Sequence, residues 1–395
     1  MKGKGGIKMN ITIAIDSLKG SLTSLEAGHA AAEGMKRVFP HAQIQIRPLA
    51  DGGEGTVEAL IEGMGGEFLE AHVTGPLGEA RTCTYGILKD GKTAVIEMAD
   101  VAGLPLVPEE KRNPMETTTY GVGEVIQDAI KRGCRHFLIG IGGSATNDGG
   151  AGMLQALGFG LLDKNGEQIE HGAKGLSKLA AITEDGVMKE LKECTFRIAC
   201  DVNNPLCGKL GASAVYGPQK GATKEMVQQM DQWLGDFGKL AMDAGYHAQP
   251  DHPGTGAAGG MGFACLTFLN AILEPGVKII LEETKLEDYI KNADIVVTGE
   301  GRLDAQTVMG KAPIGVARLA KTFHKPVIAF SGCISEGATA CNAEGIDAYF
   351  PILRTPQTVE EAMNPETARK NMIETSEQVF RLIHTICERT TTSIS

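Results

Sequence analysis

Carboxylate side chains and short glycine runs follow most of the apolar segments in this 395-residue chain. Ligands of open α/β sheets bind beyond the carboxyl ends of the strands, so these polar positions are where chemistry is expected. A single acidic residue after a strand is usually a helix cap or a turn former. The occurrence of acidic residues at many strand ends is harder to explain by capping and turn formation alone. The positions concerned are Asp16, Lys19, Ser21, Asp51, Glu54, Asp201, Glu300, Arg302, Asp304 and the glycine-rich segment 142–150.

This combination of residue types suits phosphoryl transfer from a magnesium nucleotide. Glycine loops present backbone N–H groups to phosphate oxygens. Carboxylates hold Mg²⁺, which also bridges phosphates. A cation such as Lys19 or Arg302 neutralises charge during the transfer. The candidate phosphate cradle is the loop that contains Gly142, Gly143, Ser144, Asn147 and Asp148.

The acidic residues divide into two expected groups. Asp201, Glu300 and Asp304 are candidates for a magnesium ligand or for the base that orients the attacking hydroxyl. Order along the chain does not show which side chains converge, so the roles within this group stay open, with Asp201 and Glu300 as the expected metal ligands. Together with Lys19, the three form the expected catalytic set. The remaining candidates for contact with substrate or phosphate are Asp16, Ser21, Asp51, Glu54 and Arg302.

Three segments match nucleotide-binding patterns without the required context. Residues 86–93 fit G-x-x-x-x-G-K-[ST], but they lie across a hairpin signal, and a strand rather than a helix follows Lys92. Residues 254–259 fit G-x-G-x-x-G but follow a polar loop, so they are expected to open a helix beside the site. Residues 140–145 follow a strand, but no acidic residue closes a second strand about 20 residues later, so NAD binding is not supported.

The elements that must position these residues alternate in a βα rhythm at both ends of the chain. Between them, alternating strands include a hairpin at Asp90-Gly91. The expected fold is α/β, with a Rossmann-like parallel-sheet domain from residues 9–72 and 285–395 and an inserted mixed α/β domain at 73–284. The main expected strands are 11–16, 43–50, 136–141, 196–201, 293–301, 325–332 and 345–353, and the main helices are 21–39, 121–132, 224–245, 311–322 and 366–389.

The charge and the hydropathy pattern of the chain disfavour two classes of partner, nucleic acids and membranes. The net charge of −11 disfavours nucleic acid as the main partner. No apolar run approaches the roughly 20 residues of a membrane span. The nine cysteines are scattered without a C-x-x-C pair, which favours reduced thiols in a cytoplasmic protein. The partners are therefore expected to be small molecules.

The strongest motifs resemble the type I glycerate kinases of bacteria. The likeness runs in order from about residue 9 to 385. It implies ATP-dependent phosphorylation of D-glycerate in the cytoplasm, usually giving 2-phosphoglycerate. It also implies two α/β domains with the active site in the cleft between them. The segments that carry the resemblance are 16–21, 50–56, 140–152, 201–205, 254–260 and 298–307.

Several alternatives stay open at this point. Another small hydroxy acid is a possible substrate, and the 3-hydroxyl of glycerate is a possible acceptor. A sensor that binds sugar acids without turnover is disfavoured, because many carboxylates do not help to bind an anion. The oligomeric state is open, with a homodimer as one expectation.

Overall fold

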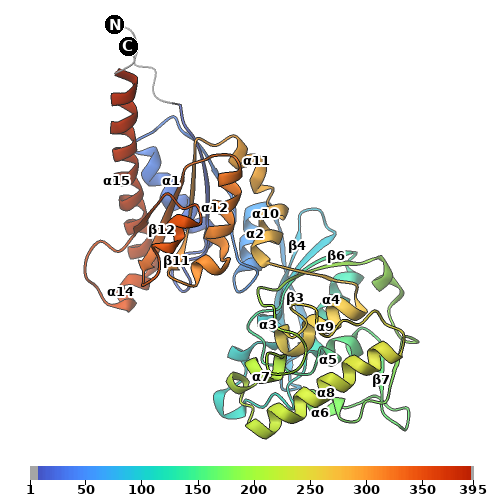
Figure 1. The fold of residues 1–395 in the computed structure, drawn as a ribbon. Coiled ribbons are helices and arrows are strands. Elements are labelled where there is room, and N and C mark those ends of the chain that lie inside the picture. Colours follow the sequence, from blue (N-terminus) through green and yellow to red (C-terminus); the bar gives the residue numbers. More distant parts are fainter. Residues whose placement is uncertain (1–7, 393–395) are drawn as a thin grey trace. The chain divides into compact units, whose positions relative to one another are not determined.

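The computed structural model describes residues 8–392, which divide into two units (Figure 1). The first unit comprises the chain up to Asp51, Glu62–Met64 and the chain from Ile280 onward; the second comprises Gly52–Ile61 and Gly65–Ile279. These bounds lie a few residues before the expected positions 72/73 and 284/285. The physical reason at the first position is that β3 (Gly66–Thr74) pairs along its whole length with β4 (Ala80–Leu88). This pairing keeps β3 in the sheet of the second unit.

The first unit is built on a five-stranded parallel sheet in the order β13-β12-β11-β1-β2. Numbered along the unit, this order is 2-1-3-4-5, a doubly wound arrangement whose topological switch point lies between β1 and β11. The expected parallel sheet from both chain ends is confirmed. Its strands are β1 (Asn10–Ile15), β2 (Gln43–Ile46), β11 (Ile295–Leu303), β12 (Val327–Ile334) and β13 (Ala348–Pro351). β2 is shorter than expected, since Pro48 has no N–H to continue the pairing.

Helices cover both faces of this sheet. In Figure 1, α1 and α15 pack side by side on one face, and α12 lies across the other against β11 and β1. Helix α1 begins after Thr23, whose hydroxyl accepts from the Glu26 N–H in a capping box. The helices of the unit are α1 (Ser24–Lys36), α11 (Leu286–Lys291), α12 (Ala312–Thr322), α13 (Ala340–Ala343), α14 (Val359–Met363) and α15 (Pro365–Thr392).

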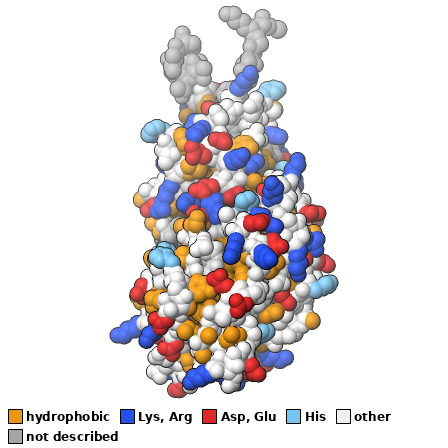
Figure 2. All heavy atoms as spheres, turned by 90° about the vertical axis from the view of Figure 1, so that its right-hand side faces the viewer, with side chains coloured by type: hydrophobic (Ala, Val, Ile, Leu, Met, Phe, Trp, Pro, Cys, Tyr) orange, Lys and Arg blue, Asp and Glu red, His pale blue; other side chains and the backbone are white. Residues whose placement is uncertain are grey.

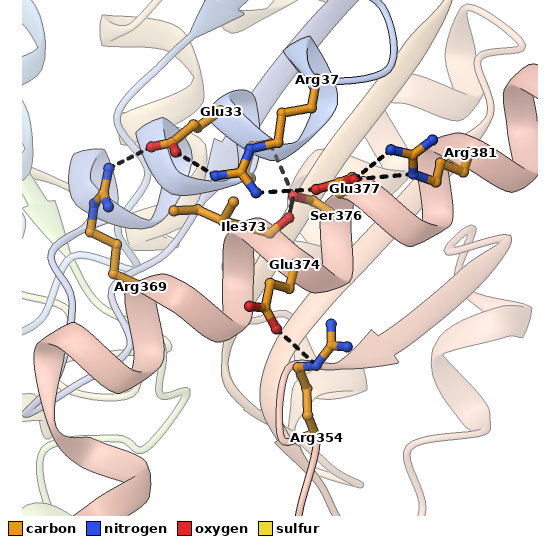
Figure 3. Close-up of polar contacts among 10 residues, drawn as sticks. Glu33, Arg37, Arg354, Arg369, Ile373, Glu374, Ser376, Glu377 and Arg381 are labelled. Carbon is orange, nitrogen blue, oxygen red and sulfur yellow. Dashed lines mark hydrogen bonds and ion pairs between the residues drawn. The ribbon is translucent and has the colours of Figure 1, made fainter.

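The contact between α1 and α15 joins the two ends of the chain. A Cβ at Gly34 would lie 2.2 Å from the carbonyl oxygen of Ile373, so glycine is required for this close approach. The Ser376 hydroxyl donates to the Ala31 carbonyl at 3.1 Å. Around this core, Arg37 bridges carboxylates of both helices (Figure 3). Exposed ion pairs of this kind contribute little, so burial of small side chains stabilises the contact.

The second unit contains a six-stranded sheet in the order β10-β9-β6-β5-β4-β3. β5, β6, β9 and β10 are parallel, while β3 and β4 are antiparallel. The strands not yet located are β5 (Thr93–Glu97), β6 (His136–Gly140), β9 (Thr195–Ala199), β10 (Ile272–Glu274) and the separate pair β7 (Gly160–Leu162) and β8 (Ala181–Thr183). The expected mixed α/β character of the middle of the chain is confirmed.

Helices of the second unit pack against this sheet and one another, and two further helices pass between the units. Those of the unit are α3 (Met98–Ala102), α4 (Tyr120–Lys131), α5 (Ala151–Ala156), α6 (Ala173–Leu176), α7 (Ala212–Tyr216), α8 (Lys224–Asp243) and α9 (Ala257–Phe268). The connecting helices are α2 (Thr56–Met64) and α10 (Gly276–Glu283). The first residues of each connecting helix therefore belong to the second unit.

The segment that mimics a P-loop is a β-hairpin. Gly86 lies in β4, and Thr93 begins β5. Asp90 closes the turn by accepting from the N–H groups of Lys92 and Thr93 at 2.8 and 2.9 Å. Strand β5 follows the turn directly, where a P-loop would have the start of a helix, so the pattern has no phosphate-binding geometry.

Replacing Lys92 by Ala is expected to leave the KM for ATP and the turnover within about twofold of wild type, since the exposed side chain extends from a hairpin turn. Steady-state kinetics at saturating acceptor measures both constants. A loss of orders of magnitude in ATP affinity would move the nucleotide site to this hairpin.

Candidate functional site

The carboxyl ends of β1 and β11 bring two acidic side chains together at the switch point. Ile15 is in register with Gly299, so Asp16 and Glu300 follow neighbouring positions on adjacent strands. The Asp16 N–H donates to the Gly299 carbonyl at 2.9 Å. Both side chains are buried, with relative exposures of 7%. Residues 284 positions apart in the chain thus form one site.

The Asp16 carboxyl group is the most perturbed acid of this site. Burial, with the nearby charge of Asp51 and then of Glu300, raises its pKa to about 7, although the Ser17 N–H and Lys19 act in the opposite direction. The Ser17 N–H donates to Asp16 Oδ1 at 2.7 Å. A carboxylate with a pKa near 7 can accept a proton at neutral pH.

Glu300 is held by a hydroxyl and faces a lysine. The Thr307 hydroxyl donates to Glu300 Oε1 at 2.7 Å, and Lys311 Nζ lies 3.6 Å from Oε2. Burial nevertheless raises the pKa of Glu300, with contributions from Asp304 and Asp51. Asp304 itself accepts from the N–H groups that follow it, those of Gln306 and Thr307. Asp304 therefore shapes the turn that presents Thr307 to Glu300.

The cationic and hydroxyl candidates of the first unit differ in exposure. Lys19 and Arg302 are exposed. Lys19 lies in a tight loop in which Leu18 and Leu22 bridge, and its charge acts on Asp16. The Ser21 hydroxyl of the same loop is buried and has no hydrogen-bond partner within the described structure. Such a hydroxyl is normally satisfied by a ligand or a water molecule.

In the second unit, Glu97 occupies the start of α2. Its carboxylate oxygens accept from the N–H groups of Val57 at 2.8 Å and Gly55 at 3.3 Å. Burial still raises the pKa of Glu97 to about 7, and Asp100 adds to this effect. The N-terminus of α2 is therefore already compensated by an internal carboxylate. Glu54, an expected substrate contact in the same loop, is exposed.

Asp201 caps the second connecting helix. Its Oδ1 accepts from the N–H of Gly276, the first residue of α10, at 3.1 Å. The side chain is thus engaged in a helix cap, the ordinary role of an acidic residue after a strand. A role as magnesium ligand or base would need its second oxygen.

The buried half of the glycine loop is organised around Asp148. Its Oδ2 accepts from both the N–H and the hydroxyl of Thr119 at 2.8 Å, and its carboxylate also accepts from Gly150 and Gly152 at the start of α5. Burial raises the pKa of Asp148. Asn147 is equally buried and donates to the Ser213 hydroxyl at 2.9 Å. Both side chains face the interior of the unit.

The glycines of this loop serve two purposes. Gly149 of this loop and Gly259 of the segment 254–260 both have positive φ. The Gly149 N–H donates to the Gly259 carbonyl at 2.9 Å, so this segment packs directly on the loop. Gly142 and Gly143, by contrast, are exposed, and a Cβ at Gly142 would meet nothing within 4 Å. The part of the loop that a ligand can reach is therefore the backbone after β6.

Sequence reasoning missed several side chains of these clusters. Thr307 and Lys311 lie in the segment after β11, and Glu97 ends an apolar strand. All three therefore stand at or after a strand end, where the sequence predicts ligand contacts. Lys220 contacts the glycine loop, but it lies in the polar turn Gly217–Gly221, where the sequence pattern does not indicate a site. A buried lysine cannot be distinguished from a surface lysine by its neighbours in sequence.

The donor chemistry of the first unit fits a magnesium ion. The charge of Asp51 raises the pKa of both Asp16 and Glu300, and a divalent cation would relieve this repulsion. Within residues 8–392, no three acidic, histidine or cysteine side chains group closely enough to hold a metal by themselves. Mg²⁺ is usually held by one or two carboxylates together with substrate phosphates, so the residues present suffice.

The surface gives further context for ligands. On the face drawn in Figure 2, the described Lys and Arg side chains are interspersed with Asp and Glu. None of the helices described between residues 8 and 392 combines the length and apolar character needed to cross a bilayer.

Comparison with known proteins identifies the family. The model of the glycerate kinase family matches residues 11–384. The glycerate kinase of Haemophilus influenzae is 49% identical over 376 residues, which cover 95% of this chain and 99% of that protein. The glycerate 2-kinase of Escherichia coli K12 is 48% identical over 354 residues, covering 90% of this chain and 93% of that protein.

A solved structure agrees with the fold. A crystal structure of a Salmonella typhimurium LT2 protein assigned as glycerate kinase 2 matches with a TM-score of 0.89 at 45% sequence identity. The match covers 97% of this chain and 100% of that one. The resemblance inferred from the sequence motifs is confirmed.

Proposed function

This chain belongs to the glycerate kinase family, and from that premise we propose that it transfers the terminal phosphoryl group of ATP to the 2-hydroxyl of D-glycerate, giving 2-phosphoglycerate and ADP. The observation that carries the proposal is the pairing of Asp16 with Glu300 at the switch point of a doubly wound sheet. The family match across nearly the whole chain supports it.

In the proposed mechanism, Asp16 accepts the proton of the attacking hydroxyl. Its raised pKa matches this role, and its hydrogen bond from Ser17 fixes the carboxyl group. The exposed ammonium of Lys19 binds the carboxylate of glycerate or stabilises the transferring phosphoryl group. The Ser21 hydroxyl, which lacks a protein partner in the described structure, donates to the same anion.

Glu300 would hold Mg²⁺, with Asp51 as the second carboxylate, while Thr307 and Lys311 orient Glu300. A bound magnesium ion would supply positive charge that neutralises the phosphate groups. The exposed backbone of Gly142 and Gly143 supplies N–H donors for phosphate oxygens. Arg302, Glu54 and Asp201 remain proposed contacts of the ligands. We also propose a cytoplasmic location, since the cysteines form no disulfide within the described residues.

The 2-hydroxyl is the favoured acceptor because its position is the more restricted of the two. It is attached to the carbon next to the carboxylate, whereas the 3-hydroxyl is one atom further away. A site that clamps the carboxylate through short contacts therefore fixes the 2-hydroxyl better for in-line attack. The relative named glycerate 2-kinase supports the same choice.

The test couples product formation to enolase. Purified protein with ATP, Mg²⁺ and D-glycerate is expected to consume ATP, and enolase should convert the product directly to phosphoenolpyruvate. A product that requires phosphoglycerate mutase first is 3-phosphoglycerate, which removes the regiochemical claim and keeps the kinase claim. A panel of other small hydroxy acids serves as the control, and turnover of one of these without turnover of glycerate would replace the substrate.

A further inference from the structure

Lys220 is a buried cation on the inner side of the glycine loop. It ends the short 3-10 helix Pro218–Lys220 and is 2% exposed. Its Nζ donates to the Ser144 hydroxyl at 2.8 Å and to the Thr146 carbonyl at 2.6 Å. Both accepting oxygens are uncharged and belong to the loop that follows β6. Lys220 thus holds two points of this loop from within the unit.

The bond to Ser144 determines which way that hydroxyl can act. A hydroxyl has one hydrogen to donate and two lone pairs with which to accept. Because Lys220 can only donate, it occupies a lone pair of Ser144 and leaves the hydroxyl hydrogen for another acceptor. The positive charge also polarises the hydroxyl and makes it a stronger donor. Ser144 directly follows the exposed backbone of Gly142 and Gly143.

We infer that Lys220 is a positioning residue for phosphate binding: its ammonium group fixes the loop and directs the Ser144 hydroxyl as a donor to a phosphate oxygen of the nucleotide. The inference rests on the proposed function only in taking ATP as the source of that phosphate. The lysine does not touch the ligand; it acts through Ser144 and through the loop backbone.

The energetics argue against a purely structural role. Burying an ammonium group against neutral oxygens is unfavourable, and burial lowers the pKa of Lys220 to about 7, while Asp148, the charged group facing it, acts in the opposite direction. An apolar side chain at this position would avoid that cost. A buried lysine with a perturbed pKa beside an exposed glycine backbone is typical of functional sites.

The first experiment measures binding of ATP, and separately of inorganic tripolyphosphate, by calorimetry without glycerate. Lys220→Met is expected to weaken both ligands by about tenfold or more, because the polarised donor is lost. Lys220→Arg should retain part of the affinity. Lys178→Met is the matched control, since Lys178 is an exposed lysine of the same unit that pairs with Glu170, and it should bind as wild type does. Binding by Lys220→Met equal to that of the control overturns the inference.

A double-mutant cycle separates positioning from folding. Ser144→Ala should weaken ATP to a similar extent, and the double variant should be no weaker than the stronger single variant, since both remove one donor. Additive losses would mean that Lys220 acts independently of Ser144 and would contradict the proposal. If Lys220→Met fails to fold, Ser144→Ala and Lys220→Arg still decide: wild-type phosphate affinity in Ser144→Ala overturns the inference.

The pH dependence provides a third readout. Phosphate binding favours the protonated lysine, so wild-type affinity should fall as the pH rises above about 7. Lys220→Arg keeps its charge and should show a smaller fall; parallel profiles would contradict the role of the ammonium. Failure of glycerate turnover with normal ATP binding would affect the proposed function alone, because these measurements contain no glycerate.

Discussion

Replacing Asp16 by Asn is expected to lower kcat by about 10³-fold while the KM for ATP stays within a few-fold of wild type. The amide has nearly the same shape as the carboxyl group but cannot accept the proton of the attacking hydroxyl. Steady-state kinetics with D-glycerate measures both constants. Asp294→Asn is the matched control, because Asp294 accepts from the Asn10 N–H at the opposite end of the same strand pair. It should retain wild-type kcat.

The same substitution has a predicted effect on stability. The folded protein holds a proton on Asp16 up to a pKa of about 7, above the ordinary aspartate pKa of 3.8, so this group stabilises the fold at low pH and loses that contribution as the pH rises through 7. The Asn variant lacks this decline and should be no less stable than wild type at pH 8. Urea unfolding at pH 5 and pH 8 measures the difference. Wild-type turnover in a folded Asp16→Asn variant would exclude Asp16 as the proton acceptor.

Replacing Lys19 by Ala is expected to lower kcat/KM for glycerate by at least about 10²-fold, since a cation that stabilises developing charge is lost. Lys19 is exposed and lies in the loop directly after β1, and its charge acts on Asp16. The variant should fold normally, because its side chain buries little surface.

Lys36→Ala provides the comparison for Lys19, as Lys36 is an exposed lysine in the last turn of α1. It should match wild type in kcat/KM. Addition of salt should reduce the wild-type rate more than that of Lys19→Ala, since screening acts on the charge that the variant lacks. Near-normal kinetics in a folded Lys19→Ala variant would make Lys19 a solvated turn residue.

Local patterns in the sequence were sufficient for the elements and the fold class. Period-2 and period-3.6 apolar patterns predicted β1, β6, β11, α4 and α8 close to their observed bounds. The Asp90-Gly91 signal identified the hairpin correctly, because turn geometry depends on residues within a few positions. The boundary between the units near residue 72 was harder to predict from the sequence. Only pairing between β3 and β4 shows which sheet contains β3.

The sequence by itself determined which residue types stand at the strand ends, and the motifs among them determined the family. It did not determine what each carboxylate meets. Asp148 and Asp201 accept from backbone N–H groups at the starts of α5 and α10, whereas the charge of Glu300 acts on Asp16 from the neighbouring strand. Asp16, Asp148 and Asp201 follow a strand, and Glu300 lies in the second half of β11. The difference arises because the neighbour that decides it comes from a distant part of the chain through strand register and helix packing, which only the tertiary structure specifies.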